Sequence, residues 1–219
     1  MKLWVVLALL TGPLAAQSVR SRLEGRVPSS VIPTIDSLVQ SAPQEGLPTE
    51  PLIQKAIEGG AKHIEGPRIV AAVQVSLGQL RGARDLLVRA GDAPPVQPAE
   101  VTTVAWALRR GLPTAVVERV AAALPRPPRS PALHAVADLV AHRFEPDSAA
   151  TLIIDAVQAG VPQDRLLDVS TATLHEVQRG RNRFEALATV RQLLPNVPAP
   201  AKPGHGAVAG ARRPAPTPP

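Results

Sequence analysis

Apolar side chains recur every three or four residues along most of the chain, which is the spacing of one face of an α-helix. The run Ile69, Val73, Leu77 and Leu80 shows this spacing. No segment alternates apolar and polar residues strictly enough to predict a β-strand. The pattern predicts an all-α fold, an array of about nine short antiparallel helices. We place them at 33–42, 49–58, 66–89, 98–110, 113–124, 131–143, 147–159, 162–178 and 181–194.

A short motif separates several of these helices. It reads GLPT at 46–49 and at 111–114, and GVPQ at 160–163. Glycine suits the left-handed residue that ends a helix, proline suits the first turn of the next helix, and Thr49 or Thr114 can supply an N-cap oxygen. Phosphate-binding loops carry several glycines and usually a lysine, which this motif lacks. We therefore interpret it as the corner of a degenerate helical-hairpin repeat, with 66–89 fusing two units.

The first residues, MKLWVVLALLTGPLAAQ, are organised like a secretory signal peptide. One lysine precedes a short apolar run, and a Thr-Gly-Pro break and two small residues follow. The apolar run is shorter than the roughly 20 residues of a membrane span. We predict a signal peptide at 1–16, a flexible segment at 17–32 and one helical domain at 33–194. A buried N-terminal helix is the alternative for the first segment.

Residues 195–219 are rich in proline and alanine and contain no acidic residue. This composition predicts a disordered tail, because it buries too little apolar surface to offset the entropy of ordering. The whole chain carries a formal net charge of +6, and the tail contributes Lys202, Arg212 and Arg213. A basic tail of this kind can contact an anionic membrane or a cell-wall surface.

The overall composition excludes or disfavours several kinds of binding and catalytic site. The chain has no cysteine, which excludes disulfides, zinc–thiolate sites and thiol nucleophiles. Aromatic residues make up 2% of the sequence, which argues against sites that stack sugar rings or nucleic-acid bases on aromatic side chains. The richness in alanine, arginine, proline and valine is typical of a high-GC bacterial gene, so we expect the protein in the periplasm or outside the cell.

One stripe of polar residues has the types that bind metals. His134, Asp138 and His142 are spaced four apart and share one face of the predicted helix. The two histidines are about 12 Å apart along the axis, so only neighbouring members can share an ion and further ligands must come from other helices. The alternative is a solvated face opposite the apolar stripe of the same helix.

Arginines form the other candidate sites. The body carries Arg109-Arg110 at a predicted helix end and the run Arg179, Arg181 and Arg183 at a predicted corner. The second cluster and the tail cations are candidates for contact with an anion or a charged surface, and solvated surface is the alternative. No HExxH, GxSxG, SxxK or P-loop sequence occurs, and serines such as Ser148 stand where helix caps are expected.

Together these patterns favour an exported, non-enzymatic helical interaction or scaffold protein of the bacterial envelope. Its partner is expected to be another envelope protein, and its tail to contact a partner or an anionic surface. No cofactor is predicted, and the scarcity of aromatics argues against nucleic acid. The alternatives are a metal-binding protein or enzyme that uses the helix of His134, Asp138 and His142, and a carrier of a small ligand.

Overall fold

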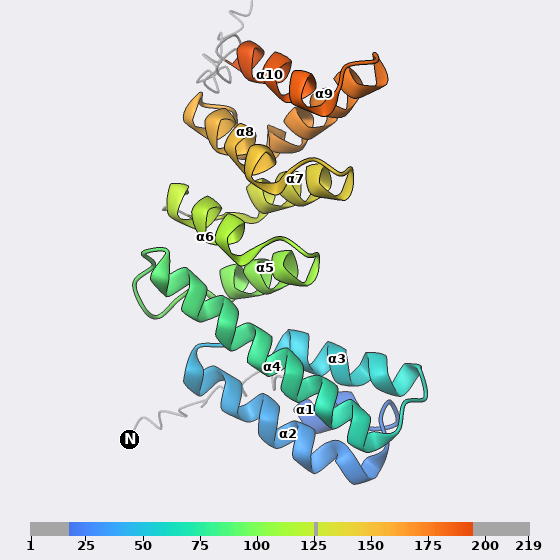
Figure 1. Ribbon diagram of the computed structural model, residues 1–219. Helices are drawn as coiled ribbons and strands as arrows, with labels where there is room; N and C mark the ends of the chain where they lie inside the picture. The colour runs from blue at the N-terminus through green and yellow to red at the C-terminus, as the bar shows by residue number, and fades with distance from the viewer. Residues whose placement is uncertain (1–17, 125–126, 195–219) are drawn as a thin grey trace, which may run out of the picture.

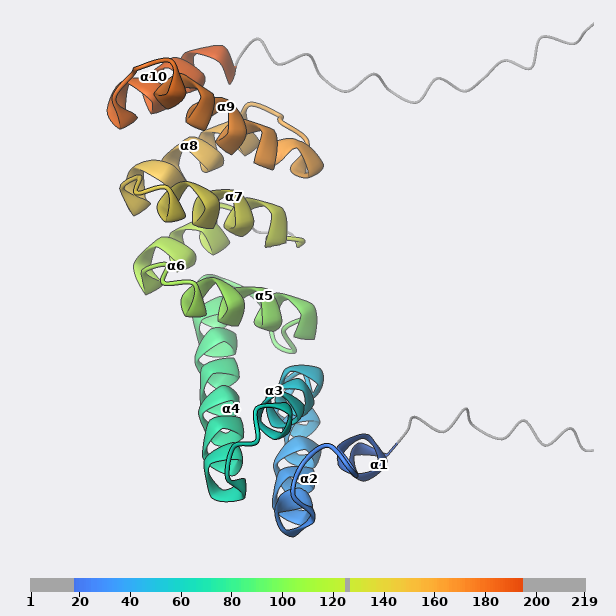
Figure 2. The same ribbon diagram turned by 90° about the vertical axis from the view of Figure 1, so that its right-hand side faces the viewer.

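The computed structural model describes residues 18–124 and 127–194, which fold into α-helices and short 3₁₀-helices without any strand (Figure 1). This confirms the all-α prediction. The helices follow one another along a single direction, so the molecule is elongated. Its first part is a bundle, and its second part is a series of helical hairpins laid one on another (Figures 1 and 2).

The first four helices form what we call the N-terminal bundle: α1 (Val19–Leu23), α2 (Ile32–Ser41), α3 (Glu50–Ala61) and α4 (Gly66–Arg89). Helix α1 packs on α2 and α3, and α4 packs on both α2 and α3. Helix α4 has 24 residues and continues beyond its neighbours until it meets α5 and α6 (Figure 2). It therefore joins the bundle to the rest of the molecule.

The remaining helices form what we call the stack: α5 (Pro98–Arg109), α6 (Thr114–Ala123), α7 (Ser130–Ala141), α8 (Pro146–Gln158), α9 (Leu166–Gln178) and α10 (Arg183–Leu193). They make two layers. Helix α7 contacts α5 and α9 in one layer, and α8 contacts α6 and α10 in the other. This arrangement of successive hairpins is compatible with the predicted degenerate repeat.

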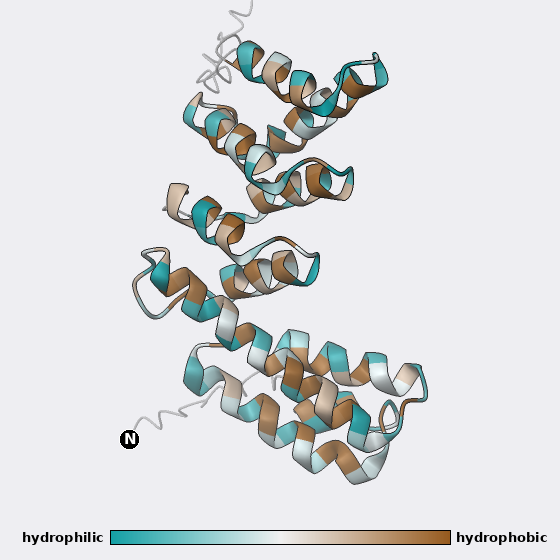
Figure 3. Cartoon of the chain, viewed as in Figure 1, coloured by the Kyte–Doolittle hydropathy of each residue, from teal (hydrophilic) through white to brown (hydrophobic). Residues whose placement is uncertain are grey.

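The core is made of aliphatic residues and alanine. Helix α7, in the middle of the stack, buries Ala132, Leu133, Ala135, Val136 and Leu139. Small side chains on its faces let the helices on both sides approach closely. Hydrophobic and hydrophilic residues alternate along every helix (Figure 3). Phe144, just after α7, is buried in this core, and the partly buried Trp106 packs against it.

The predicted helix boundaries agree with the observed ones to within a few residues, and the range 66–89 is that of α4. The start of α9 differs because residues Gln163–Arg165 form a 3₁₀-helix before it. The segment 17–32, expected to be flexible, also differs, since it contains α1 and a 3₁₀-helix at Ser29–Val31. Leu23 is fully buried there, and an apolar anchor of this kind holds the segment on the bundle.

The corners between helices follow one geometry. After α5, the amide of Gly111 donates to the carbonyl of Leu108 and the amide of Leu112 donates to that of Ala107. This pair of bonds satisfies the last carbonyls of the helix and requires a left-handed residue, which suits glycine. Gly111 has φ +87°, and the interpretation of the motif as a corner is confirmed. The same pair of bonds closes the turns at Gly46, His63, Gly91, Arg143, Gly160 and Gly180.

The predicted caps at the helix starts are wrong in detail. The Thr49 side chain makes no capping hydrogen bond, and Thr114 is already the first residue of α6, after Pro113. At α8 the cap is Glu145, whose carboxylate accepts from the amides of Asp147 and Ser148. Hydrogen bonds from Ser148 and Asp147 lower the pKa of Glu145. A proline in the first turn removes one of the amides that a cap would otherwise have to satisfy.

Two predictions concern the ends of the chain. The predicted signal peptide at 1–16 and the predicted tail at 195–219 lie outside the described residues. Between residues 18 and 194, apart from 125–126, no helix combines the length and the apolarity that a membrane crossing requires.

Candidate functional site

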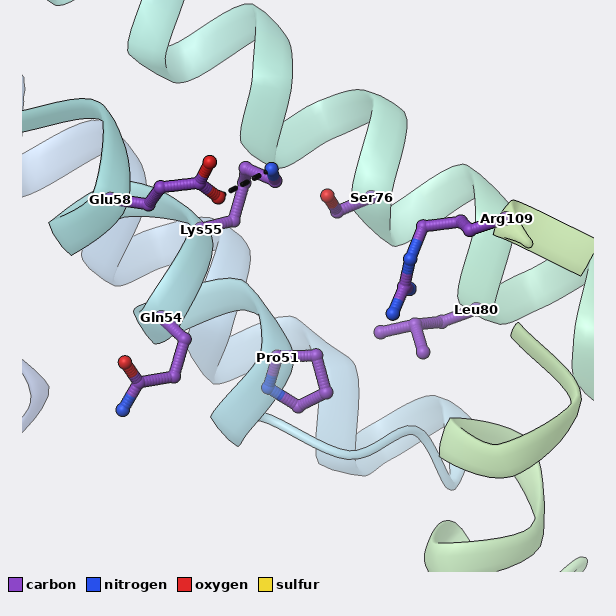
Figure 4. Close-up of a pocket in the computed structure, with 7 residues that line it drawn as sticks. All are labelled: Pro51, Gln54, Lys55, Glu58, Ser76, Leu80 and Arg109. Atoms are coloured by element: carbon purple, nitrogen blue, oxygen red, sulfur yellow. Dashed lines mark hydrogen bonds and ion pairs between the residues drawn. The ribbon is translucent and has the colours of Figure 1, made fainter. Parts of the chain in front are cut away.

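A notch opens where the N-terminal bundle meets the stack (Figure 4). We call this hollow, of about 410 Å³, the α3–α5 notch. It is lined by Pro51, Gln54, Lys55 and Glu58 from α3, by Ser76 and Leu80 from α4, and by Arg109 from α5.

The helix lengths create this notch. Helix α3 covers only part of the longer α4, and α5 meets α4 further along (Figure 2). Between these two contacts, α4 lines the notch with the half-buried Ser76 and the almost fully buried Leu80. The Pro51 ring and the Leu80 side chain give the notch an apolar patch between polar groups (Figure 4).

The α3 wall of the notch carries one carboxylate that pairs with two lysines. Glu58 Oε2 lies 2.7 Å from Lys55 Nζ, and the other carboxylate oxygen accepts from Lys62. Hydrogen bonds from Lys55, the larger contribution, and from Lys62 lower the pKa of Glu58 to about 2. This carboxylate is therefore ionised at every physiological pH and holds the two lysines along α3.

Arg109 stands opposite this wall, in the last turn of α5. Its guanidinium reaches over Leu80 into the notch (Figure 4). Within residues 18–124 and 127–194 it makes no ion pair and no side-chain hydrogen bond. The neighbouring Arg110 instead lies over the Trp106 ring, 5.9 Å from its centroid. The notch thus offers a planar cation that is free to bind a carboxylate in a bidentate fashion.

The predicted metal-binding stripe lies on α7, away from the notch. The His134 ring packs on Trp106 of α5, with ring centroids 4.0 Å apart. Asp138 Oδ2 accepts a 2.9 Å hydrogen bond from Ser170 Oγ of α9, and His142 Nδ1 is 3.7 Å from the other oxygen of Asp138. In the part of the chain that the structure describes, no group of three or more His, Cys, Asp or Glu side chains is placed to hold a metal.

The predicted basic cluster at the α9–α10 corner binds within the chain. Arg179 Nη1 and Arg181 Nε each lie 2.7 Å from the carboxylate of the nearly buried Glu176. Arg183 Nε donates to the carbonyl of His142, 3.1 Å away. These arginines therefore fasten the corner of the stack. The other predicted surface contacts, Lys202, Arg212 and Arg213, lie outside the described residues.

Sequence reasoning missed a buried charge network at the base of the stack. Arg129 is fully buried, and its guanidinium is 2.6 Å from Asp92 Oδ1 and 3.3 Å from Glu100 Oε2. It also donates through Nε to the carbonyls of Ala121 and Leu124. The network joins the α4–α5 loop, α5 and the loop before α7, so its role is structural. A signal was present in Glu100, an acid beside the apolar stripe of α5.

Comparison with protein-family models, with curated proteins and with solved structures finds no match for this chain.

Proposed function

We propose that this protein is an exported, non-enzymatic interaction protein of the bacterial envelope, and that a segment of its partner binds in the α3–α5 notch. The single observation that carries the proposal is Arg109, which reaches into the notch and has no acidic partner among the described residues. A two-layer helical array supports such a role, because it offers extended surfaces that a compact domain of the same length does not.

The notch also indicates the chemistry of the partner. Leu80 and Pro51 suit an aliphatic side chain, and Arg109 suits a carboxylate beside it. Lys55 adds a second positive charge on the opposite wall, although it is shared with Glu58. We therefore expect an acidic, partly apolar protein segment. Charge complementarity of this kind contributes to association rate and specificity more than to raw affinity.

Export and the tail complete the proposal. The signal-peptide pattern at 1–16 supports secretion, and Lys202, Arg212 and Arg213 support contact of the tail with anionic membranes or cell-wall polymers. Mass spectrometry of the mature protein should find an N-terminus at residue 17. Binding to anionic vesicles should fall steeply as salt rises, and binding that does not depend on salt would remove the electrostatic role of the tail.

Capture from an envelope extract tests the notch. The bait is the protein itself, compared with Arg109→Glu and with Arg110→Glu. The two variants make the same charge change on adjacent residues, but only Arg109 lines the notch. We expect a specific partner to be retained by the unmodified protein and by Arg110→Glu, and to be lost with Arg109→Glu. Equal retention by all three would contradict binding in the notch.

A further inference from the structure

Two glycines lie in the middle of α4 where neither packing nor backbone conformation requires them. Gly78 and Gly82 are exposed residues of this 24-residue helix, and neither has a positive φ. A β-carbon added at either position would meet no described atom within 4 Å. Glycine inside a helix is destabilising relative to alanine, because it loses more conformational freedom on folding and leaves the backbone open to water. The two glycines therefore weaken α4 at this point.

This weak point lies where the two parts of the molecule join. The main contacts between the bundle and the stack are those of α4 with α5 and α6 (Figure 2). Helix α3 forms one side of the α3–α5 notch and Arg109 of α5 forms the other, and Ser76 and Leu80 of α4 line it between them (Figure 4). Gly78 lies between these two α4 residues in the sequence. A bend of α4 here moves the two sides of the notch relative to each other.

The glycines also lie on the side of α4 that favours closing of the notch. With about 3.6 residues per turn, Gly78 and Gly82 face away from Ser76 and Leu80. Helices bend with their convex side towards solvent, because carbonyls on that side tilt towards water and their hydrogen bonds lengthen. Glycine leaves these carbonyls accessible to water. The easiest bend therefore has the glycines on its outer side, and it brings α3 and α5 towards each other.

One tie between the bundle and α4 crosses this region. The carboxylate of Glu45, at the end of the 3₁₀-helix Ala42–Glu45, accepts a 2.7 Å hydrogen bond from Arg81 Nε and a second bond from Arg81 Nη2. The carbonyl of Glu45 accepts from Arg84 Nη1, 3.2 Å away. The side chains of Arg81 and Glu45 are 46% and 30% exposed, and ion pairs at the surface contribute little to stability. This tie restrains a bend of α4 but does not prevent it.

We propose that α4 is a hinge, and that bending at Gly78 and Gly82 closes the α3–α5 notch on the segment that binds there. The closure rests on the proposed function of the notch, whereas the hinge itself does not. The unbound protein exchanges between a straight and a bent form of α4. A bound segment shifts this equilibrium towards the bent form, because α3 and Arg109 then contact it from both sides.

Pulsed electron paramagnetic resonance on the purified protein tests the hinge. The chain has no cysteine, so spin labels attach only at Ala61→Cys on α3 and Ala99→Cys on α5, two exposed positions that do not line the notch. We expect a broad distribution of distances with a short component from the bent form. Gly78→Ala combined with Gly82→Ala should reduce this component by up to about fivefold for each substitution, because alanine favours the straight helix.

A glycine moved along the same face of α4 is the matched control. Ala71→Gly, added to the two alanine substitutions, places a glycine about two turns before Gly78. It lies close to Ile69, which packs on Gly59 of α3, so a bend there does not change the notch. The short distances should not return in this variant. Their return, or a distribution that the two alanines leave unchanged, would overturn the hinge whatever the notch binds.

The capture experiment tests whether the hinge serves the notch. The variant with alanine at both glycines should retain the partner less well than the unmodified protein, because its notch closes less often. Full retention together with a narrowed distance distribution would overturn closure of the notch. The resonance measurement needs no partner, and Arg109→Glu leaves both glycines in place. A failure of the hinge and a failure of the proposed binding in the notch are therefore distinguishable.

Discussion

In the N-terminal bundle, a β-carbon added at Gly60 would come within 1.8 Å of the backbone oxygen of Arg26, whereas in the stack a β-carbon added at Gly160 would meet no atom within 4 Å. Gly60 sits in a helix and allows another part of the chain to pass close by. Gly160 has φ +86° and ends a helix. The bundle therefore needs glycine for space at Gly60 as well as for backbone conformation at Gly46, whereas Gly160 in the stack serves backbone conformation alone.

The bundle and the stack also differ in where the ion pairs described here lie. The bundle is tied at its surface by Arg22, which bonds both carboxylate oxygens of Glu50 at 2.7 Å. The stack is tied at its base by the buried Arg129. Exposed ion pairs contribute little, whereas breaking a buried one leaves an uncompensated charge. The same corner geometry occurs in both parts, but the bundle adds a close helix approach at Gly60 and the stack adds one buried charge network.

The largest effect is expected at the base of the stack. Arg129→Met removes the cation and leaves the carboxylates of Asp92 and Glu100 facing each other in a buried site. We expect a loss of about 3–5 kcal/mol in the free energy of unfolding, measured with urea. Adding Asp92→Asn and Glu100→Gln should recover part of this loss. A loss below about 1 kcal/mol would mean that the network does not hold the stack.

The next effect lies in the bundle. Gly60→Ala should lower the free energy of unfolding, measured with urea, by about 3 kcal/mol, because the backbone of Arg26 must move to admit the methyl group. Gly78→Ala is the matched control, since Gly78 lies in the open middle of α4. That change should stabilise the protein by about 0.5–1 kcal/mol through helix propensity. Equal effects of the two substitutions would contradict the close approach of α3 and Arg26.

A smaller effect on stability is expected at the helix ends, where Arg143 and Gly160 adopt the same left-handed conformation. Arg143 closes α7 with φ +66°, a conformation that costs energy for any residue with a β-carbon. Arg143→Gly should raise the unfolding free energy by about 0.5–1 kcal/mol, and Gly160→Ala should lower it by a similar amount. Both are read from urea unfolding. Opposite signs at these two corners would support one shared geometry, and the same sign would contradict it.

The smallest effect on stability is expected at the exposed Arg22–Glu50 ion pair of the bundle. The Arg22 guanidinium, with Gln54, lowers the pKa of Glu50 from 4.5 to about 2. Because the folded-state pKa is the lower one, the stabilisation is present above pH 4.5 and is lost as the pH falls towards 2. Glu50 is 56% exposed, so solvent screening limits its size to at most about 1 kcal/mol. Glu50→Gln should make the midpoint of thermal unfolding slightly less dependent on pH between about pH 2 and 4.5. An unchanged pH dependence would contradict a stabilising Arg22–Glu50 ion pair.

Much of the fold could be predicted from the sequence because its signals are local. The range of α4 follows from apolar spacing, and the corners at Gly111 and Gly160 follow from glycine and proline. The corners at His63 and Arg143 gave no such signal, because these residues adopt the left-handed conformation against their preference. Helix α1 is too short for periodicity to reveal, and it is held by burial of Leu23.

The sites could not be predicted in the same way because they depend on contacts between distant segments. Arg129 binds Asp92, 37 positions away, and nothing local to either residue indicates the pair. The notch is assembled from α3, α4 and α5, so its lining has no motif. The polar stripe on α7 had the spacing of a site, but its neighbours Trp106 and Ser170 come from other helices and pair with two of its members.

Site-specific photo-crosslinking in living cells can show whether a partner segment binds in the α3–α5 notch. A photoreactive side chain at Ser76 lies in the notch, and one at Thr171 lies exposed on α9 as the control. We predict a discrete protein adduct from position 76 that disappears when Arg109→Glu is added, and no such adduct from position 171. The same adduct from both positions, or one from position 76 that survives Arg109→Glu, would contradict partner binding in the notch.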